Sequence, residues 1–254
     1  MAPELSVFSS ELVGFARMKA ITVAAFALNA ALYVAAGVFF YSVLPLSFGP
    51  VRFWPQAVIP AVFAAVFGPW VGGFGAGLGI FLNDIILGGN PLLSLMAGVT
   101  SNFVGFWLVG YIARRKIRWS SSVMGYGIVT VFLLAIAYFF TDFVYVGLVA
   151  VSFLIFLGFA LLFRRYFGHE WQSFQVGSVT GLLVGSAIIG LMVPVYLQYF
   201  ANSSPITLGS GLAFFIWTFT TEIGFMLALG PPIIAVIYLA FPSFKPKEHE
   251  RESN

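Results

Sequence analysis

Residues 48–89, FGPVRFWPQAVIPAVFAAVFGPWVGGFGAGLGIFLNDIILGG, decide the fold of this chain. A polar, aromatic loop at 52–55 leads into an apolar run, 55–67, which a Gly-Pro pair ends. A bilayer core needs about 20 helical residues, so this run is too short for an ordinary span. The next segment, 70–87, is long enough, is rich in glycine and ends near two polar groups, Asn83 and Asp84. We interpret the stretch as half of a solute site in a membrane transporter.

The composition predicts an all-α integral membrane protein. Of the 254 residues, 60% are hydrophobic, 8% are charged and none is cysteine. Continuous apolar runs of about 20 residues recur along the chain, which argues against a β-barrel, whose strands alternate. The net charge of +3 comes from basic residues at span ends, and we expect no nucleic-acid partner. Without cysteine, disulfides and thiolate metal sites are excluded.

The apolar segments predict a polytopic bundle of six to eight transmembrane helices. Besides the two segments above, the expected spans are 17–41, 92–113, 122–141, 144–163, 175–200 and 208–241. We expect a cytoplasmic N-terminal segment at 1–16, a transmembrane domain at 17–241 and a polar cytoplasmic tail at 242–254. The last apolar segment is too long for one straight crossing, and Gly230-Pro231-Pro232 should kink or break it.

Basic residues set the expected orientation. If the N-terminus is cytoplasmic, the basic groups at 17/19, 114–118, 164/165 and 245/247 all fall on the cytoplasmic side. Both termini are then inside, after eight crossings, or six if the second or fifth segment is not a full span.

Four ionisable residues lie in or near the membrane away from the cytoplasmic face: Arg52, Asp84, Asp142 and Glu222. A charge at the bilayer centre costs about 2.5–3.5 kcal/mol, so it needs a partner, a water-filled cavity or a proton. Glu222 is the deepest, and its helix face also carries Trp217, Thr218 and Thr221. We expect this face to contact a solute or line a cavity; the alternative is a structural tie to another span.

The other candidates have alternatives of their own. Arg52 and Asp84, which follows Asn83, either contact the solute or pair to seal the outer end of the bundle. Asp142 fits a solvated loop. Asn29 and Asn102 suit interhelical hydrogen bonds or ligand contacts, and Trp54 and Trp107 are candidates for stacking on a ring of the solute.

Alanines recur at three- or four-residue spacing along the first span: Ala20, Ala24, Ala27, Ala31 and Ala35. Residues so spaced share a helix face, and small ones allow another helix to approach closely. The face either packs within the chain or docks a partner subunit.

Motifs of enzymes are missing. The sequence holds no HExxH, GxSxG or GxxxxGK[ST] pattern and two histidines. We therefore expect no enzyme, no metal site and no cofactor. If ATP drives transport, another subunit must supply the ATPase.

Residues 17–114 resemble the substrate-binding (S) components of energy-coupling factor (ECF) vitamin transporters. The loop RFWPQAVIP at 52–60 is similar to the family's aromatic loop before a short helix, and FGPWVGG at 67–73 is similar to its Gly-Pro-x-x-Gly turn. The alanine face resembles the family's AxxxA-type docking face. The family has six spans, so we interpret 122–165 as an added hairpin on a core at 17–114.

The resemblance implies a multi-pass subunit in a prokaryotic cell membrane. It would capture a vitamin-like molecule outside and deliver it with a coupling subunit and two ATPases. It also implies a site near the outer face, which suits Arg52 and Trp54 and extends to Trp217 and Glu222. Two other classes stay open: a proton- or sodium-coupled carrier that uses Asp84 or Glu222, and a membrane scaffold without transport.

Overall fold

The computed structural model describes residues 3–115, 117, 119–166, 171–203 and 205–245. Its elements in chain order are α1 (Pro3–Val43), β1 (Ser47–Phe48), β2 (Val51–Arg52), η1 (Pro55–Ala57), α2 (Val58–Phe67), α3 (Pro69–Ile86), α4 (Pro91–Leu93), η2 (Ser94–Val99), α5 (Thr100–Ala113), α6 (Trp119–Phe140), α7 (Phe143–Tyr166), α8 (Gln172–Tyr199), α9 (Leu208–Ala240) and η4 (Pro242–Phe244). This is the all-α polytopic architecture that the composition predicts. Of the expected tail, 246–254 lies outside the described residues.

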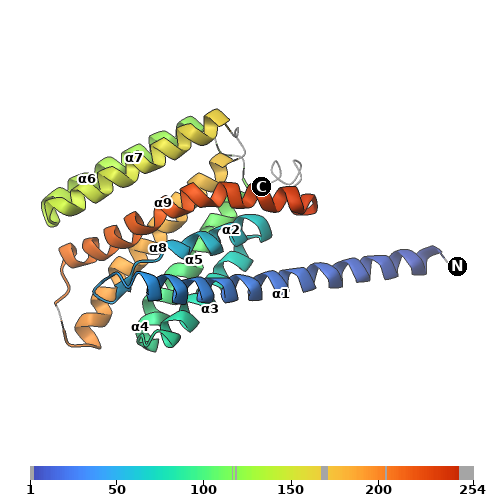
Figure 1. Ribbon diagram of the computed structural model, residues 1–254, viewed down its shortest axis with the longest axis horizontal. Coiled ribbons are helices and arrows are strands. Elements are labelled where there is room, and N and C mark those ends of the chain that lie inside the picture. Colours follow the sequence, from blue (N-terminus) through green and yellow to red (C-terminus); the bar gives the residue numbers. More distant parts are fainter. Residues whose placement is uncertain (1–2, 116, 118, 167–170, 204, 246–254) are drawn as a thin grey trace.

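Six helices of the described part are long and apolar enough to cross a membrane. They cover Lys19–Val43, Pro91–Ala113, Val123–Phe140, Phe143–Phe163, Gln172–Tyr199 and Leu208–Ala240. The short apolar helix at Pro55–Phe67 and the 18-residue α3 are the two remaining segments of the predicted eight. Helix α1 begins at Pro3 and extends beyond the bundle, so residues 3–16 continue the first span as one helix (Figure 1).

Residues 48–89 contain two tight turns, one before α2 and one after it. Strands β1 and β2 form a hairpin, and Gly49 has a φ of 56° at its turn, which a glycine accommodates without strain. Gly68, with a φ of 108°, separates α2 from α3, and Pro69 takes the first helical position, where its missing N–H is not needed. The Gly-Pro pair thus turns the chain instead of continuing one span.

Helices α1 and α3 are joined by two asparagine side chains, each of which packs against a glycine of the other helix. Asn29 of α1 donates to the Val71 carbonyl at 3.0 Å, and a Cβ on Gly75 would lie 2.2 Å from its amide nitrogen. In the reverse direction, Asn83 of α3 donates to the Tyr33 carbonyl at 3.1 Å and lies over Gly37. Each amide donates a hydrogen bond to a carbonyl of the other helix. A side chain in place of the glycine hydrogen would block this close approach. The interhelical alternative for Asn29 is therefore confirmed.

Helix α9 is continuous across Pro231 and Pro232, so of the predicted kink or break, the break is wrong. Gly230 and Pro231 are buried, and the ring of Phe174 from α8 fills the place of the missing Gly230 side chain. Packing against α8 holds the helix where the proline nitrogens cannot donate.

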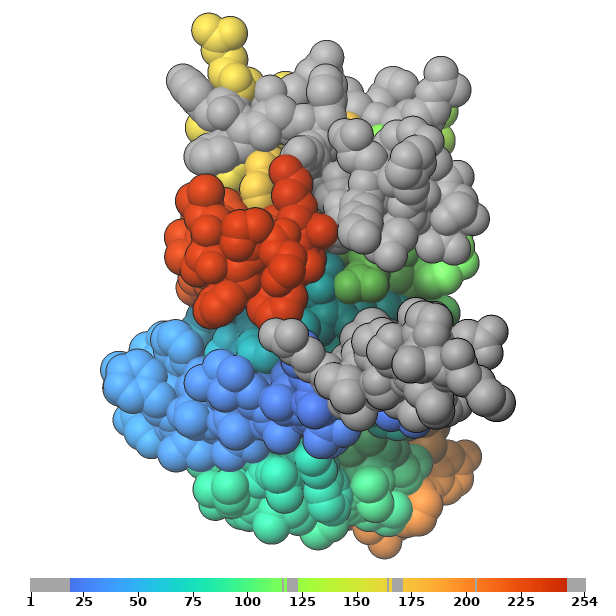
Figure 2. All heavy atoms as spheres, turned by 90° about the vertical axis from the view of Figure 1, so that its right-hand side faces the viewer, coloured from blue at the N-terminus to red at the C-terminus, as the bar shows by residue number. Residues whose placement is uncertain are grey.

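Helices α8 and α9 lie between the α6–α7 hairpin and the pair α1 and α3 (Figure 1). Figure 2 views the end of the molecule at which α9 finishes, and shows the last turns of α9 between α1 and the end of α7. The α6–α7 hairpin packs mainly on α9, whereas the other helices pack more closely against one another.

Candidate functional site

A cavity of about 340 Å³ lies at the end of the bundle that carries the β1–β2 hairpin. Its walls come from that hairpin, α3, η2, α5, α8 and α9, so segments far apart in the sequence converge on it. The size falls in the range of small-molecule sites, roughly 300–1,000 Å³. Apolar side chains dominate the lining, with a few polar groups among them.

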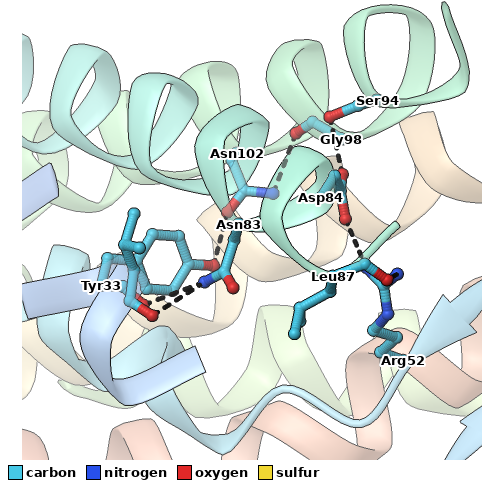
Figure 3. A network of polar contacts seen from close by, with 9 residues as sticks. Tyr33, Arg52, Asn83, Asp84, Leu87, Ser94, Gly98 and Asn102 are labelled. Carbon is cyan, nitrogen blue, oxygen red and sulfur yellow. Dashed lines mark hydrogen bonds and ion pairs between the residues drawn. The ribbon is translucent and has the colours of Figure 1, made fainter. Parts of the chain in front are cut away.

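An ion pair joins the β1–β2 hairpin to α3 at this cavity. Arg52 Nη1 lies 2.6 Å from Asp84 Oδ1, and Arg52 Nη2 donates to the Leu87 carbonyl at 3.4 Å (Figure 3). The second carboxylate oxygen of Asp84 accepts a hydrogen bond from Ser94 Oγ at 2.6 Å. Arg52 also stands over the Tyr41 ring, 5.2 Å from its centroid. Both charged side chains are therefore paired within the protein, as the pairing alternative predicts.

A second set of polar contacts fixes the wall next to this pair. Tyr33 Oη donates to Asn102 Oδ1 at 2.7 Å, and Asn102 Nδ2 donates to the Gly98 carbonyl at 2.9 Å (Figure 3). Gly98 lies in η2, a π-helical turn that interrupts the span Pro91–Ala113 and brings Ser94 and Gly98 to the cavity. Such π-bulges often occur at functional sites.

Aromatic rings form one side of the cavity. Trp54 and Phe106 line it, and the fully buried Tyr33 stands edge-on to both rings, with centroid distances of 6.4 and 6.3 Å. Edge-to-face pairs of this kind hold rings in fixed orientations. Tyr33 therefore positions two rings and, through Asn102, the neighbouring wall.

Glycines form another part of the lining, where α5 and α8 meet. Gly105, Gly181 and Gly185 all line the cavity. A Cβ on Gly181 would lie 2.4 Å from the Gly105 carbonyl oxygen, so the two backbones touch. The cavity is therefore lined by bare backbone as well as by aromatic side chains.

Three buried polar groups of the lining have no partner among the described residues: the Trp54 indole N–H, the Glu222 carboxylate and the Ser186 hydroxyl. Glu222 of α9 is 7% exposed, and its carboxylate makes no hydrogen bond or ion pair there. Ser186 of α8 is fully buried, and its hydroxyl has no partner. The nearest hydroxyl on the Glu222 face, that of Thr218, donates to the Phe214 carbonyl of its own helix at 2.9 Å. A carboxylate, a hydroxyl and an indole N–H are thus left for whatever fills the cavity.

The structure brings five of the predicted site residues to the cavity: Arg52, Trp54, Asp84, Asn102 and Glu222. Three others lie elsewhere. Asn83 faces α1, Thr221 donates its hydroxyl to the Trp217 carbonyl, and the ring of Trp217 lies 6.0 Å from that of Phe48. Consecutive helix positions are rotated by about 100°, so Thr218 and Glu222 face the cavity while Trp217 and Thr221 lie beside it.

Several lining residues were not among those predicted from the sequence. They include Ser94 and Gly98 of η2, Phe106 of α5, and Gly181, Gly185 and Ser186 of α8. The four-residue spacing of Gly177, Gly181 and Gly185 was a usable signal for close packing of α8. The glycines of α3 do not line the cavity; Gly72, Gly75 and Gly79 pack against α2 and α1 instead.

The alanine face of α1 points away from the bundle. Its five members are exposed: Ala20, Ala24, Ala27, Ala31 and Ala35. The opposite face is buried against the rest of the chain through Ala25, Asn29, Ala30, Tyr33 and Gly37. Trp107, the second stacking candidate, lies outside the cavity and stacks on Tyr111, with ring centroids 5.1 Å apart.

Comparison with known families places most of the chain. Residues 17–164 match the family described as "ECF-type riboflavin transporter, S component". The matched range includes α6 and α7, which the sequence analysis interprets as an added hairpin, and ends before α8. Neither the comparison with curated proteins nor that with solved structures finds a match. This family is one of membrane transporter components and not of enzymes. On this match, which spans more than half of its length, the chain belongs to the ECF-type riboflavin transporter S-component family.

Proposed function

We propose that the chain is the substrate-binding subunit of an ECF-type importer and that it captures riboflavin or a closely related flavin. The observation that carries the proposal is the cavity of about 340 Å³, whose lining combines the rings of Trp54 and Phe106 with the bare backbone of glycines. Such a lining suits a planar heteroaromatic molecule. The family's description supplies the solute class.

The β1–β2 hairpin supports entry from the outside. It lies at the end of the bundle opposite the basic cluster that begins at Arg114, and basic clusters mark the cytoplasmic side. The cavity is therefore proposed to face outward, in a prokaryotic cell membrane with both termini inside. Arg52 and Asp84 would then tie the hairpin over the solute.

The exposed alanine face of α1 is proposed as the docking surface for the coupling subunit, which would bring two ATPases. Small residues let two helices approach closely in lipid, and the five alanines are exposed. The described part of the chain offers no phosphate-binding loop, so the energy would come from those partners.

The direct test is binding by the purified chain alone. Riboflavin is titrated with protein in lipid nanodiscs, and the quenching of flavin fluorescence is followed. We expect saturable binding at one site per chain without ATP. Absence of binding under conditions in which the protein is folded would refute the proposal.

A separate test addresses docking. Ala24→Trp or Ala31→Trp should prevent co-purification with the coupling subunit and leave riboflavin binding unchanged. Leu32→Trp is a matched control, because Leu32 is also exposed but lies off the alanine face. Loss of binding together with assembly would indicate that the alanine face serves the fold of this chain.

A self-sufficient carrier is the second candidate, because an unpartnered carboxylate such as Glu222 is what proton coupling requires. It predicts riboflavin uptake into proteoliposomes that contain this chain alone, driven by a proton or sodium gradient. The S-component proposal predicts no such uptake until the coupling subunit and ATPases are added.

A further inference from the structure

The charges around the cavity are distributed unevenly. Among the described residues that line it, the charged ones are Arg52, Asp84 and Glu222. The first two neutralise each other across 2.6 Å and are held by further hydrogen bonds. Glu222 is left as the acidic group without a counter-ion, on α9, with the unpartnered hydroxyl of Ser186 on α8 lining the same space.

These two groups differ in what they can bond. An ionised carboxylate only accepts hydrogen bonds, whereas a hydroxyl both donates and accepts. A molecule that satisfies both needs an N–H for the carboxylate and a carbonyl or ring nitrogen for the hydroxyl. A bond from N–H to a buried carboxylate is charge-assisted and stronger than a neutral one.

The remaining hydroxyls near Glu222 do not compete for this role. Thr218 donates to the Phe214 carbonyl at 2.9 Å, and Thr221 donates to the Trp217 carbonyl at 2.7 Å. The amide of Asn102 is held between Tyr33 and Gly98. The polar groups of the lining are thus divided into those that build the wall and those without a partner, which are the Glu222 carboxylate, the Ser186 hydroxyl and the Trp54 indole N–H.

We propose that the solute binds with an amide- or imide-type edge, N–H beside C=O, against Glu222 and Ser186. This inference rests on the proposed function and adds the orientation of the molecule and the chemical class of the edge that is recognised. The N–H stabilises the ionised form of the carboxylate, and a ring that carries only acceptors at this edge loses this charge-assisted bond. The flat body of the solute then lies among the other lining residues, which include Gly181, Gly185, Trp54 and Phe106.

The experiment compares two probes that differ in this edge alone, lumiflavin and 3-methyllumiflavin, whose N-methyl group replaces the imide N–H. Dissociation constants are measured by fluorescence quenching with the full chain in nanodiscs. We expect lumiflavin to bind about 10–100-fold more tightly, the range for a hydrogen bond to a charged group. A methyl group also adds bulk, so the variants decide the cause.

In Glu222→Gln, the charge is lost while the shape is kept, and the preference for lumiflavin should fall about tenfold. Glu222→Asp keeps the charge and should keep a preference. Thr221→Val is the matched control, one residue away on α9 and outside the cavity, and should leave the preference unchanged. Thermal unfolding of each preparation verifies folding; if Glu222→Gln does not fold, Ser186→Ala tests the same edge by weakening lumiflavin binding.

Equal binding of the two probes to the wild type would overturn this inference, as would an unchanged preference in a folded Glu222→Gln. In either case flavin binding itself would persist, and the proposed function would stand. Binding of neither probe nor riboflavin would overturn the proposed function, and the inference with it.

Discussion

Glycines occur in two regions of this molecule, and they do different things. In the helices that surround the cavity, a Cβ at Gly72, Gly105, Gly110 or Gly181 would lie within 3 Å of another atom. In the α6–α7 hairpin, a Cβ at Gly125, Gly127, Gly147 or Gly158 would meet nothing within 4 Å. The same residue type in equally apolar helices is thus required in one region and replaceable in the other.

Burial follows the same division. The most apolar window of the α8 span is 56% buried inside the protein, compared with 17% for the α6 span. The described residues of the α6–α7 hairpin also contribute nothing to the cavity lining. High hydropathy alone therefore does not distinguish a helix that builds the site from one that is peripheral to it.

The largest expected effect comes from a methyl group at Gly110. Its Cβ would lie 2.7–2.8 Å from backbone atoms of Ala64 and Pro69, which cannot move as a side chain can. We expect Gly110→Ala to lower the free energy of unfolding by about 3 kcal/mol, at the upper end of overpacking costs. Thermal unfolding in detergent measures this, and a change below about 0.5 kcal/mol would mean that α2, α3 and α5 pack less closely than described.

An intermediate effect is expected at the ion pair that joins the hairpin β1–β2 to α3. Arg52→Met keeps much of the side-chain volume but leaves the Asp84 carboxylate with Ser94 as its partner. The pair is partly exposed, at 15% and 18%, so we expect a loss of about 1–2 kcal/mol, less than for a fully buried pair. Riboflavin should also dissociate faster, which stopped-flow fluorescence would detect.

Asp84→Asn is the companion variant for this pair. If the contact matters through charge, the amide should reproduce part of the Arg52→Met loss. If each variant leaves both stability and the dissociation rate unchanged, the ion pair has no role in closing the site.

The sequence was sufficient for the fold class and for part of the site. Arg52, Asp84 and Glu222 were recognisable because an ionisable group in an apolar segment is costly unless it has a partner or lines a cavity. All three line the cavity. The contribution of η2 was not recognisable, since a π-helical turn shifts the helical register without a sequence signature. Likewise, Ser186 and Tyr33 look ordinary until the packing of α8 on α5, and of α1 on α3, places them.

In α9, by contrast, a clear sequence signal led to a wrong prediction. Its two prolines are strong local signals for a break, yet the ring of Phe174 against Gly230 and the burial of Pro231 outweigh them. Tertiary packing decides such cases because neighbouring helices can compensate the lost backbone bond in a membrane protein.

The smallest effect, and of opposite sign, is expected at Gly158 of α7. This residue is exposed and has open space around it, so an added methyl group meets no obstacle. Alanine also has the higher helix propensity, and Gly158→Ala should raise the free energy of unfolding by about 0.5–1 kcal/mol. The same thermal assay, run beside Gly110→Ala, gives the contrast directly, because the substitution is chemically identical at the two sites. A loss at Gly158 as large as that at Gly110 would show that the hairpin face is closely packed after all, and the division between core and periphery would then have to be abandoned.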